Sequence, residues 1–297
     1  MTTALRLFIF LLTLQLHAQV IMSTAVQRRR HVAADGSIRE YNPDLKKWIF
    51  LEQHNNEGKN TALLAIEGRR FEYNFAKGEF LVNNIPIFVL PPDTVRDSMV
   101  QTDGDTGRTV WDAAVVLSKY MEMNPDEIKG KRVLELGAGT GLAGLAAAAL
   151  GAHVDISDLD YCLPLIQKNI QHTKLTVKDA LSNGNGIAKV RELDWTNAQF
   201  VQGKDTYDIV LGADIVWLEH LVDPLVAVME KLLLLNPKLK ILLGHQTRSV
   251  ATDDIFFGLL EKMFIISPVQ KPLGYQDTRV DLFELYAKMD ASCESNT

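Results

Sequence analysis

The sequence predicts an α/β fold built on a doubly wound, mostly parallel sheet of seven strands. From Val110 onward, apolar strand-like stretches alternate with helical ones, which is the pattern of a parallel sheet covered by helices. The stretch 133–136 is a short apolar strand that runs straight into glycines and then into a helix. Two final strand-like stretches, 264–266 and 280–286, have no helical segment between them and are expected to pair antiparallel. Ligands of such a sheet bind at the carboxyl ends of its strands.

Length and composition fit one large domain, or one domain with a smaller appendage. The chain has 297 residues, of which 47% are hydrophobic, enough for a full core. Its net charge is −6 and its only basic run is 28–30, so binding of nucleic acid through phosphate neutralisation is not expected. Cys162 and Cys293 do not make a disulfide framework, which favours a reduced compartment.

Residues 1–22 are either a signal-like leader or an upstream extension. Arg6 followed by the apolar stretch 7–12 resembles a secretory signal, but the stretch is too short to span a bilayer. The candidate cleavage site at 16–18 lacks a small residue at its outer position, and Met22 offers an alternative start. We expect a cytoplasmic protein, with the secretory pathway as the alternative.

Residues 23–100 are predicted to be an N-terminal extension that contains a β-hairpin. The part 23–60 is polar with turn signals and is expected to be partly disordered or loosely attached. The stretch 71–75 alternates apolar and polar residues, and 85–90 is a second strand in which Pro86 indicates an edge position. Together these two stretches predict the hairpin.

The domain 101–288 carries the alternating elements, and 289–297 is a tail. The stretch 207–212 is almost wholly apolar, which predicts a central strand. Helices are expected over 112–121, 142–150, 160–170, 221–234 and 254–263, and strands over 133–136, 152–157, 187–193, 207–212, 240–244, 264–266 and 280–286.

The glycine-rich turn is the first candidate for a binding site. Gly137, Gly139 and Gly141 leave no Cβ between the backbone and a ligand, and the helix that follows offers free N–H groups. Leu142 stands where the dinucleotide fingerprint needs its third glycine, and Glu135 precedes the glycines within the strand. The pattern is similar to motif I of the methyltransferases that use S-adenosylmethionine (SAM). The alternative is a tight turn that only lets the helix pack on the sheet.

Two further strand ends supply candidate contacts to a nucleotide. Asp158 follows the second strand about 20 residues after the glycines, where this fold places the acid that binds ribose hydroxyls. Asp155 and Asp160 are its rivals, and a helix cap is the alternative role for Asp158. Asp194 and Trp195 end the third strand, where the indole could cover an adenine and the carboxylate could accept from its amine. A core tryptophan is the competing interpretation.

Asp214 is the candidate catalytic residue. It emerges with Ala213 from the very apolar fourth strand, beside the glycine-rich turn, and a carboxylate there indicates function. Trp217 follows three residues later, and its side chain can lie close to that of Asp214. Trp111, at the head of the first helix, could cover a bound ligand or pack the helix on the sheet. No metal ligand is predicted.

Four stretches resemble, in order and spacing, the methyltransferase-like 21 group of seven-strand protein-lysine methyltransferases. They are 107–123, 133–144, 192–195 and 211–219, and the similarity covers roughly 71–288. By this resemblance the cofactor is SAM, and its contacts are Trp111, Gly137, Ala138, Gly139, Asp158, Trp195 and Ala213. Asp214 falls on the acid of the family's D-x-x-Y motif at the substrate lysine, and Trp217 replaces the tyrosine of that motif.

The resemblance implies methylation of a lysine on a partner protein. Within the group the likeness is greatest to the member that modifies heat-shock chaperones, which makes a chaperone a candidate substrate. We expect a monomer without stable membrane association. Two alternatives stay open, namely a small-molecule methyltransferase on the same fold and a SAM-binding interaction protein with weak catalysis. The target lysine and the number of methyl groups do not follow from the sequence.

Overall fold

The computed structural model describes residues 71, 73–91, 106–177, 179, 186–197 and 206–288, and the backbone of three strands nearer the N-terminus. The chain divides into two compact units, Met1–Ala62 and Leu63–Thr297. The predicted leader 1–22, the tail 289–297 and Cys293 lie outside the described residues.

The first unit contains a small antiparallel sheet that the sequence analysis did not predict. Its strands are β1 (Arg30–Val32), β2 (Ile38–Asn42) and β3 (Lys47–Glu52), in the order β1-β2-β3. The apolar run at 48–51 in β3 was the available signal, because four consecutive apolar residues between turn signals indicate a strand. The polar composition of the rest of 23–60 outweighed that signal.

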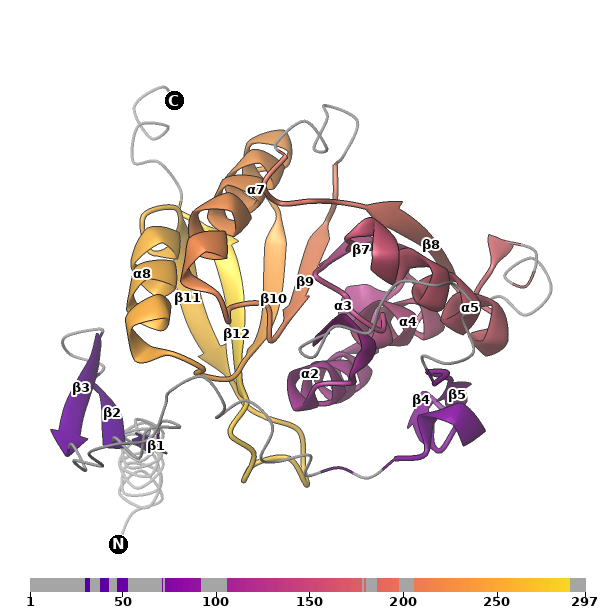
Figure 1. The fold of residues 1–297 in the computed structure, drawn as a ribbon, viewed down its shortest axis with the longest axis horizontal. Coiled ribbons are helices and arrows are strands. Elements are labelled where there is room, and N and C mark those ends of the chain that lie inside the picture. Colours follow the sequence, from indigo (N-terminus) through magenta and orange to yellow (C-terminus); the bar gives the residue numbers. More distant parts are fainter. Residues whose placement is uncertain are drawn as a thin grey trace, which may run out of the picture. The chain divides into compact units, whose positions relative to one another are not determined.

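The second unit is organised around the predicted seven-stranded sheet (Figure 1). Its order is β11-β12-β10-β9-β6-β7-β8, with β12 antiparallel to both β10 and β11 and the other neighbours parallel. The doubly wound sheet and its terminal antiparallel hairpin are therefore confirmed. The strands are β6 (Arg132–Leu136), β7 (His153–Asp158), β8 (Ile187–Glu192), β9 (Ile209–Ala213), β10 (Lys240–His245), β11 (Phe264–Val269) and β12 (Asp281–Ala287).

The strand order reverses between β6 and β9, and this reversal positions the site. The chain leaves β6 toward β7 and β8 on one side, while β9 leads to β10 on the other. Connections that diverge in this way leave a crevice at the carboxyl ends of the two neighbouring strands. The glycine-rich turn follows β6 and Asp214 follows β9, so both lie at the carboxyl ends of these two neighbouring strands, where such a crevice is expected.

Helices cover both faces of the sheet (Figure 1). One apolar cluster joins α2, α4 and α5 to sheet residues such as Val133 and Leu211, and the other joins α7 and α8 to Leu134 and Val210. Successive strand residues therefore enter opposite cores, as the two-residue period of a strand requires. The helices are α2 (Asp112–Met123), α3 (Pro125–Ile128), α4 (Leu142–Ala149), α5 (Leu163–Thr173), α7 (Val222–Leu235) and α8 (Val250–Leu260), with 3₁₀ turns η3 (Thr106–Arg108), η4 (Asp160–Cys162) and η6 (Glu219–Leu221).

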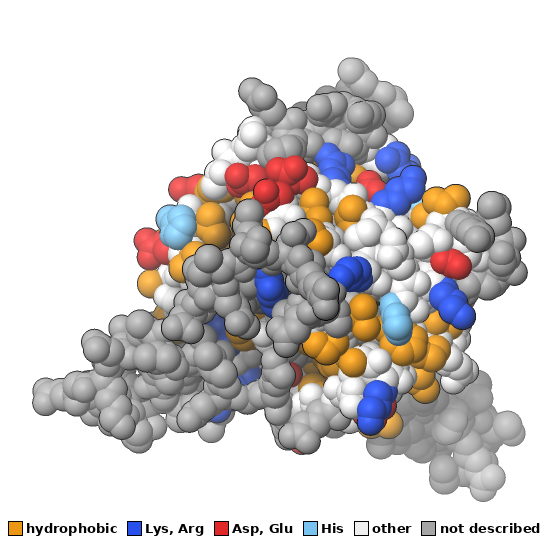
Figure 2. Space-filling view, turned by 45° about the vertical axis from the view of Figure 1, so that its right-hand side comes forward, with side chains coloured by type: hydrophobic (Ala, Val, Ile, Leu, Met, Phe, Trp, Pro, Cys, Tyr) orange, Lys and Arg blue, Asp and Glu red, His pale blue; other side chains and the backbone are white. Residues whose placement is uncertain are grey.

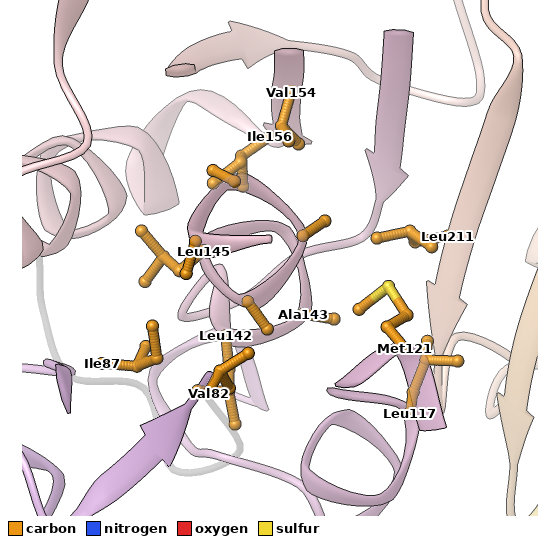
Figure 3. Packing of buried hydrophobic residues seen from close by; sticks show 14 of the residues in the cluster. Val82, Ile87, Leu117, Met121, Leu142, Ala143, Leu145, Val154, Ile156 and Leu211 are labelled. Carbon is orange, nitrogen blue, oxygen red and sulfur yellow. The ribbon is translucent and has the colours of Figure 1, made fainter. Parts of the chain in front are cut away.

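The predicted hairpin exists, but its first strand was placed wrongly. The paired strands are β4 (Phe80–Val82) and β5 (Ile85–Ile87), and part of the expected strand 71–75 leads instead into the 3₁₀ helix η1 (Phe75–Lys77). Asn83 and Asn84 both have positive φ, as a two-residue hairpin turn requires. The hairpin packs into the core, where Val82 and Ile87 lie near Leu142 (Figure 3). It belongs to the second unit, which begins at Leu63.

Helix α8 begins at Val250, four residues before the predicted start at 254. Ser249 caps it by accepting a hydrogen bond from the Thr252 backbone N–H at 3.3 Å. The polar residues at 252–254 hid this first turn from the apolar periodicity. The correction matters because it leaves only a short loop, 246–249, between β10 and α8.

The surface and the helix lengths bear on possible partners. On the face shown in Figure 2, basic side chains of the described residues alternate with acidic and hydrophobic ones and form no continuous stripe. None of the helices that the structure describes is both long and apolar enough to cross a membrane.

Candidate active site

The turn after β6 depends on three glycines. Gly137, Gly139 and Gly141 have φ angles of +57°, +55° and +81°, which residues with a Cβ rarely adopt. A Cβ built on Gly139 would lie 3.1 Å from the Gly107 carbonyl oxygen, so the segment before α2 approaches the turn closely. Gly141 forms the N-cap of α4. The turn therefore presents bare backbone at the head of a helix.

Glu135 lies inside the molecule, beneath this turn. Its side chain is 1% exposed, and its Oε2 accepts a hydrogen bond from the Gly144 N–H at 2.9 Å. Burial raises the pKa of the Glu135 carboxyl to about 8, against the opposing effect of that hydrogen bond. The structure thus places Glu135 where it fixes α4 against β6, and its influence on a ligand would be indirect.

Asp158 lies at the end of β7 and fastens the glycine turn. Its Oδ2 accepts from the Gly139 N–H at 2.6 Å, and its Oδ1 accepts from the Leu159 N–H at 2.7 Å. Both carboxylate oxygens therefore hold backbone N–H groups at the carboxyl ends of β6 and β7. Of the two rivals, Asp155 accepts instead from the Tyr207 hydroxyl at 2.6 Å, and Asp160 begins η4.

Trp195 lies against the glycine turn. A Cβ built on Gly137 would be 2.8 Å from Trp195 Cζ2, and Trp195 also packs on the core between the sheet and α7 and α8. Asp194 closes its own loop, where its Oδ1 accepts from the N–H and the hydroxyl of Thr196. The indole thus has a core contact as well as a position beside the turn, and its cover over an adenine stays a prediction.

Asp214 is paired with an arginine that the sequence analysis missed. Arg248 Nε donates to Oδ1 at 3.2 Å and its Nη2 donates to Oδ2, so the pair is bidentate. The Asp214 side chain is 3% exposed, and its φ of +57° turns the chain sharply after β9. Arg248 lies in the loop 246–249, and the only signal for it was its position after the fifth strand.

Trp111 provides the aromatic ring beside this pair. The Arg248 guanidinium lies 4.9 Å from the centroid of the Trp111 ring, in a cation–π contact. Trp111 is also the N-cap residue of α2. Trp217, by contrast, is 43% exposed, so it lies at the surface. In the sequence it follows Asp214 by three residues.

A second buried pair joins the two elements that flank the loop of Arg248. His245 Nε2 and Asp253 Oδ2 are 3.0 Å apart, and both side chains are almost fully enclosed. Burial lowers the pKa of His245, but the hydrogen bond to Asp253 and the nearby Asp214 and Asp281 carboxylates outweigh it and raise the pKa. The pair joins the end of β10 to the first turn of α8.

The sequence-predicted residues converge at the carboxyl end of the sheet. Gly137, Gly139, Asp158, Trp195 and Ala213 are all partly exposed there, although β6 and β9 are largely buried. Small residues follow or end β6 and β9, the Asp158 carboxylate ends the neighbouring strand β7, and the Trp195 indole follows the end of β8. This arrangement fits a nucleoside with a short charged tail, as SAM is, and the fold and site define a SAM-dependent methyltransferase.

Comparisons with known proteins assign the family. Residues 95–263, more than half of the chain, match the family described as lysine methyltransferase. Protein N-lysine methyltransferase METTL21A of Mus musculus is 37% identical over 160 residues, which cover 54% of this chain and 69% of that protein. METTL21A of Danio rerio is 43% identical over 41% of this chain and 54% of that protein. EEF1A lysine methyltransferase 3 of Xenopus tropicalis is 34% identical over 59% of this chain and 73% of that protein.

The chain belongs to the lysine methyltransferase family. It is an enzyme, and its cofactor is S-adenosyl-L-methionine. The match spans about half of the Danio rerio relative and more than two thirds of the other two.

Proposed function

We propose that this chain transfers a methyl group from SAM to the side-chain amine of a lysine on a partner protein. The observation that carries the proposal is Asp214, a buried carboxylate at the end of β9, next to the glycine turn at the end of β6. Membership of the lysine methyltransferase family supports the same reaction.

Each candidate residue receives a role in this proposal. Gly137, Ala138 and Gly139 let the cofactor approach the backbone, Asp158 accepts from its ribose, and Trp195 covers its adenine. Asp194 and Ala213 line the neighbouring strand ends. Trp111 closes the substrate side together with Arg248.

Bound SAM supplies an activated methyl group on a sulfonium, so this chain mainly has to position the reactants. The lone pair of the lysine amine forms the new N–C bond while the C–S bond breaks and its electron pair stays on sulfur. The amine must be neutral to attack, and Asp214 orients it by accepting a hydrogen bond. The lysine arrives as an ammonium, and Trp217 faces this cationic head before the proton is lost, a contact worth about 0.5–2 kcal/mol.

The partner is proposed to be a protein of the cytoplasm, methylated by a monomeric enzyme. The resemblance to the methyltransferase-like 21 group favours a heat-shock chaperone. The relative named EEF1A lysine methyltransferase 3 makes elongation factor 1A the competing candidate. Purified chaperone and purified elongation factor, each incubated with labelled SAM, would separate the two.

The test of the reaction is Asp214→Asn on a methylatable protein, with SAM affinity followed by calorimetry. Loss of this charge should cost roughly 2–5 kcal/mol, or about 30- to several-thousand-fold in rate, while SAM still binds. Asp208→Asn is the matched control, because Asp208 lies just before the other end of β9, where it accepts from the Arg132 N–H at 2.8 Å. Full activity of Asp214→Asn would remove Asp214 from the mechanism. Methylation of free small amines but of no protein would favour the small-molecule reaction.

A further inference from the structure

The Asp214 carboxylate, which the proposed function places at the substrate lysine, already forms an ion pair within the protein. Arg248 binds both oxygens of Asp214, and the Arg248 side chain is itself only 17% exposed. The Arg248 guanidinium also lies 4.9 Å from the centroid of the Trp111 ring. A guanidinium that contacts both a carboxylate and an indole has little freedom to leave.

The loop that carries Arg248 is fixed at both ends. β10 ends at His245, and α8 begins at Val250 with Ser249 as its cap. The buried bond between His245 and Asp253 ties these two ends together at 3.0 Å. The fold therefore holds the guanidinium at Asp214 by backbone geometry as well as by the ion pair.

The charge of Arg248 acts on the protonation of the incoming lysine. A buried carboxylate alone favours the charged ammonium and raises the pKa of a lysine beside it, which removes the nucleophilic lone pair. A bidentate arginine, which stays charged at every working pH, cancels that effect. The Asp214 oxygens can then accept a hydrogen bond from a neutral amine.

Asp214 also acts electrostatically on His245 at the end of β10, whose other charged neighbours are Asp253 on α8 and Asp281 at the start of β12. His245 and Asp253 form their own pair, which adds little net charge when both are ionised. Arg248 is thus the group that neutralises Asp214 directly.

We propose that Arg248 is a positioning residue that fixes the Asp214 carboxylate and cancels its charge, so that the substrate lysine can bind as a neutral amine. The proposal rests on the proposed function, because it presupposes a lysine at Asp214. It separates the role of Asp214, which orients the nitrogen, from the role of Arg248, which sets the nitrogen's protonation.

The experiment is the pH profile of kcat for Arg248→Met, Arg248→Lys and wild type on the same methylatable protein. Loss of the Arg248 charge in Arg248→Met should move the midpoint of the rising limb of the kcat–pH profile up by about 1–3 pH units. Below that midpoint kcat should be roughly 10- to 1,000-fold lower than in wild type. Arg248→Lys keeps the charge and should keep the wild-type midpoint. Arg132→Met is the matched control, because that guanidinium also lies over a ring, that of Tyr207 at 5.5 Å, but at the opposite end of the sheet.

The Arg248 substitutions are repeated in the Asp214→Asn variant to isolate the electrostatic effect of Arg248. In Asp214→Asn the Arg248 charge is no longer balanced and disfavours the ammonium by itself, so the midpoint should fall below that of wild type, and removal of Arg248 as well should return it toward the wild-type value. Arg248→Gln, which is neutral but retains hydrogen-bond donors, replaces Arg248→Met if circular dichroism shows that the latter is unfolded. SAM affinity, measured by calorimetry, should be retained in all of these variants.

The possible failures are distinguishable. A rate lowered equally at every pH, or a rate raised because the lysine no longer competes with Arg248, would refute the proposal and leave the proposed function intact. A wild-type enzyme that methylates no protein lysine at any pH would overturn the proposed function, and this proposal with it.

Discussion

Glu135→Gln should remove a large pH dependence of stability. The Glu135 carboxyl is 1% exposed, and burial raises its pKa from a usual value of 4.5 to about 8. Between these two values the folded state holds a proton that the unfolded state has released. The free energy of unfolding therefore falls as the pH rises through this window.

The magnitude follows from the two pKa values. Each unit of difference corresponds to about 1.36 kcal/mol, and integration from about pH 5.5 to about pH 8.5 gives a loss of about 3 kcal/mol in the wild type. Glutamine has nearly the shape of the protonated acid and can still accept from the Gly144 N–H. It cannot ionise, so this part of the pH dependence should disappear.

The assay is urea unfolding at several pH values for wild type, Glu135→Gln and Glu261→Gln, of which the last replaces an exposed glutamate. The difference in unfolding free energy between Glu135→Gln and wild type should grow by about 3 kcal/mol in favour of the variant over that range. Glu261→Gln should follow wild type. Parallel pH dependences for Glu135→Gln and wild type would refute the claim that burial keeps Glu135 protonated.

Three further predictions concern binding and catalysis. Asp158→Ala should weaken SAM binding by on the order of 1–3 kcal/mol in calorimetry, whereas Asp160→Ala should not. Equal SAM affinities of the two variants would show that the ribose is not bound by Asp158. Gly139→Ala should lower SAM affinity more than Gly130→Ala, because both glycines have positive φ but a Cβ meets nothing within 4 Å at Gly130; similar losses would indicate backbone strain alone. Trp217→Tyr should methylate protein at close to the wild-type rate and Trp217→Ala only weakly; an active alanine variant would exclude the aromatic contact.

Local sequence determined the fold of the second unit. The alternation of apolar strands and helices from residue 110 predicted the sheet, its parallel direction and its antiparallel end, because the period of apolar residues follows directly from backbone geometry. The glycine spacing predicted the turn after β6, since the positive φ angles at Gly137, Gly139 and Gly141 need residues without a Cβ. Asp158 and Asp214 were found because strand ends in this fold are set by the same pattern.

Tertiary structure decided what the candidate residues contact. Arg248 reaches Asp214 from a loop 34 positions later, and Trp111 reaches Arg248 from the other end of the domain. No local pattern encodes such pairs, because they depend on how β9 and β10 and the head of α2 meet in space. The same holds for Glu135, whose burial beneath α4 sets its pKa, and for the hairpin, whose strands were misplaced by a few residues. The sequence by itself predicted which strand ends carry the candidate site. The packing of distant segments decided which charges face one another there, because Coulomb and hydrogen-bond energies depend on separation in space and not along the chain.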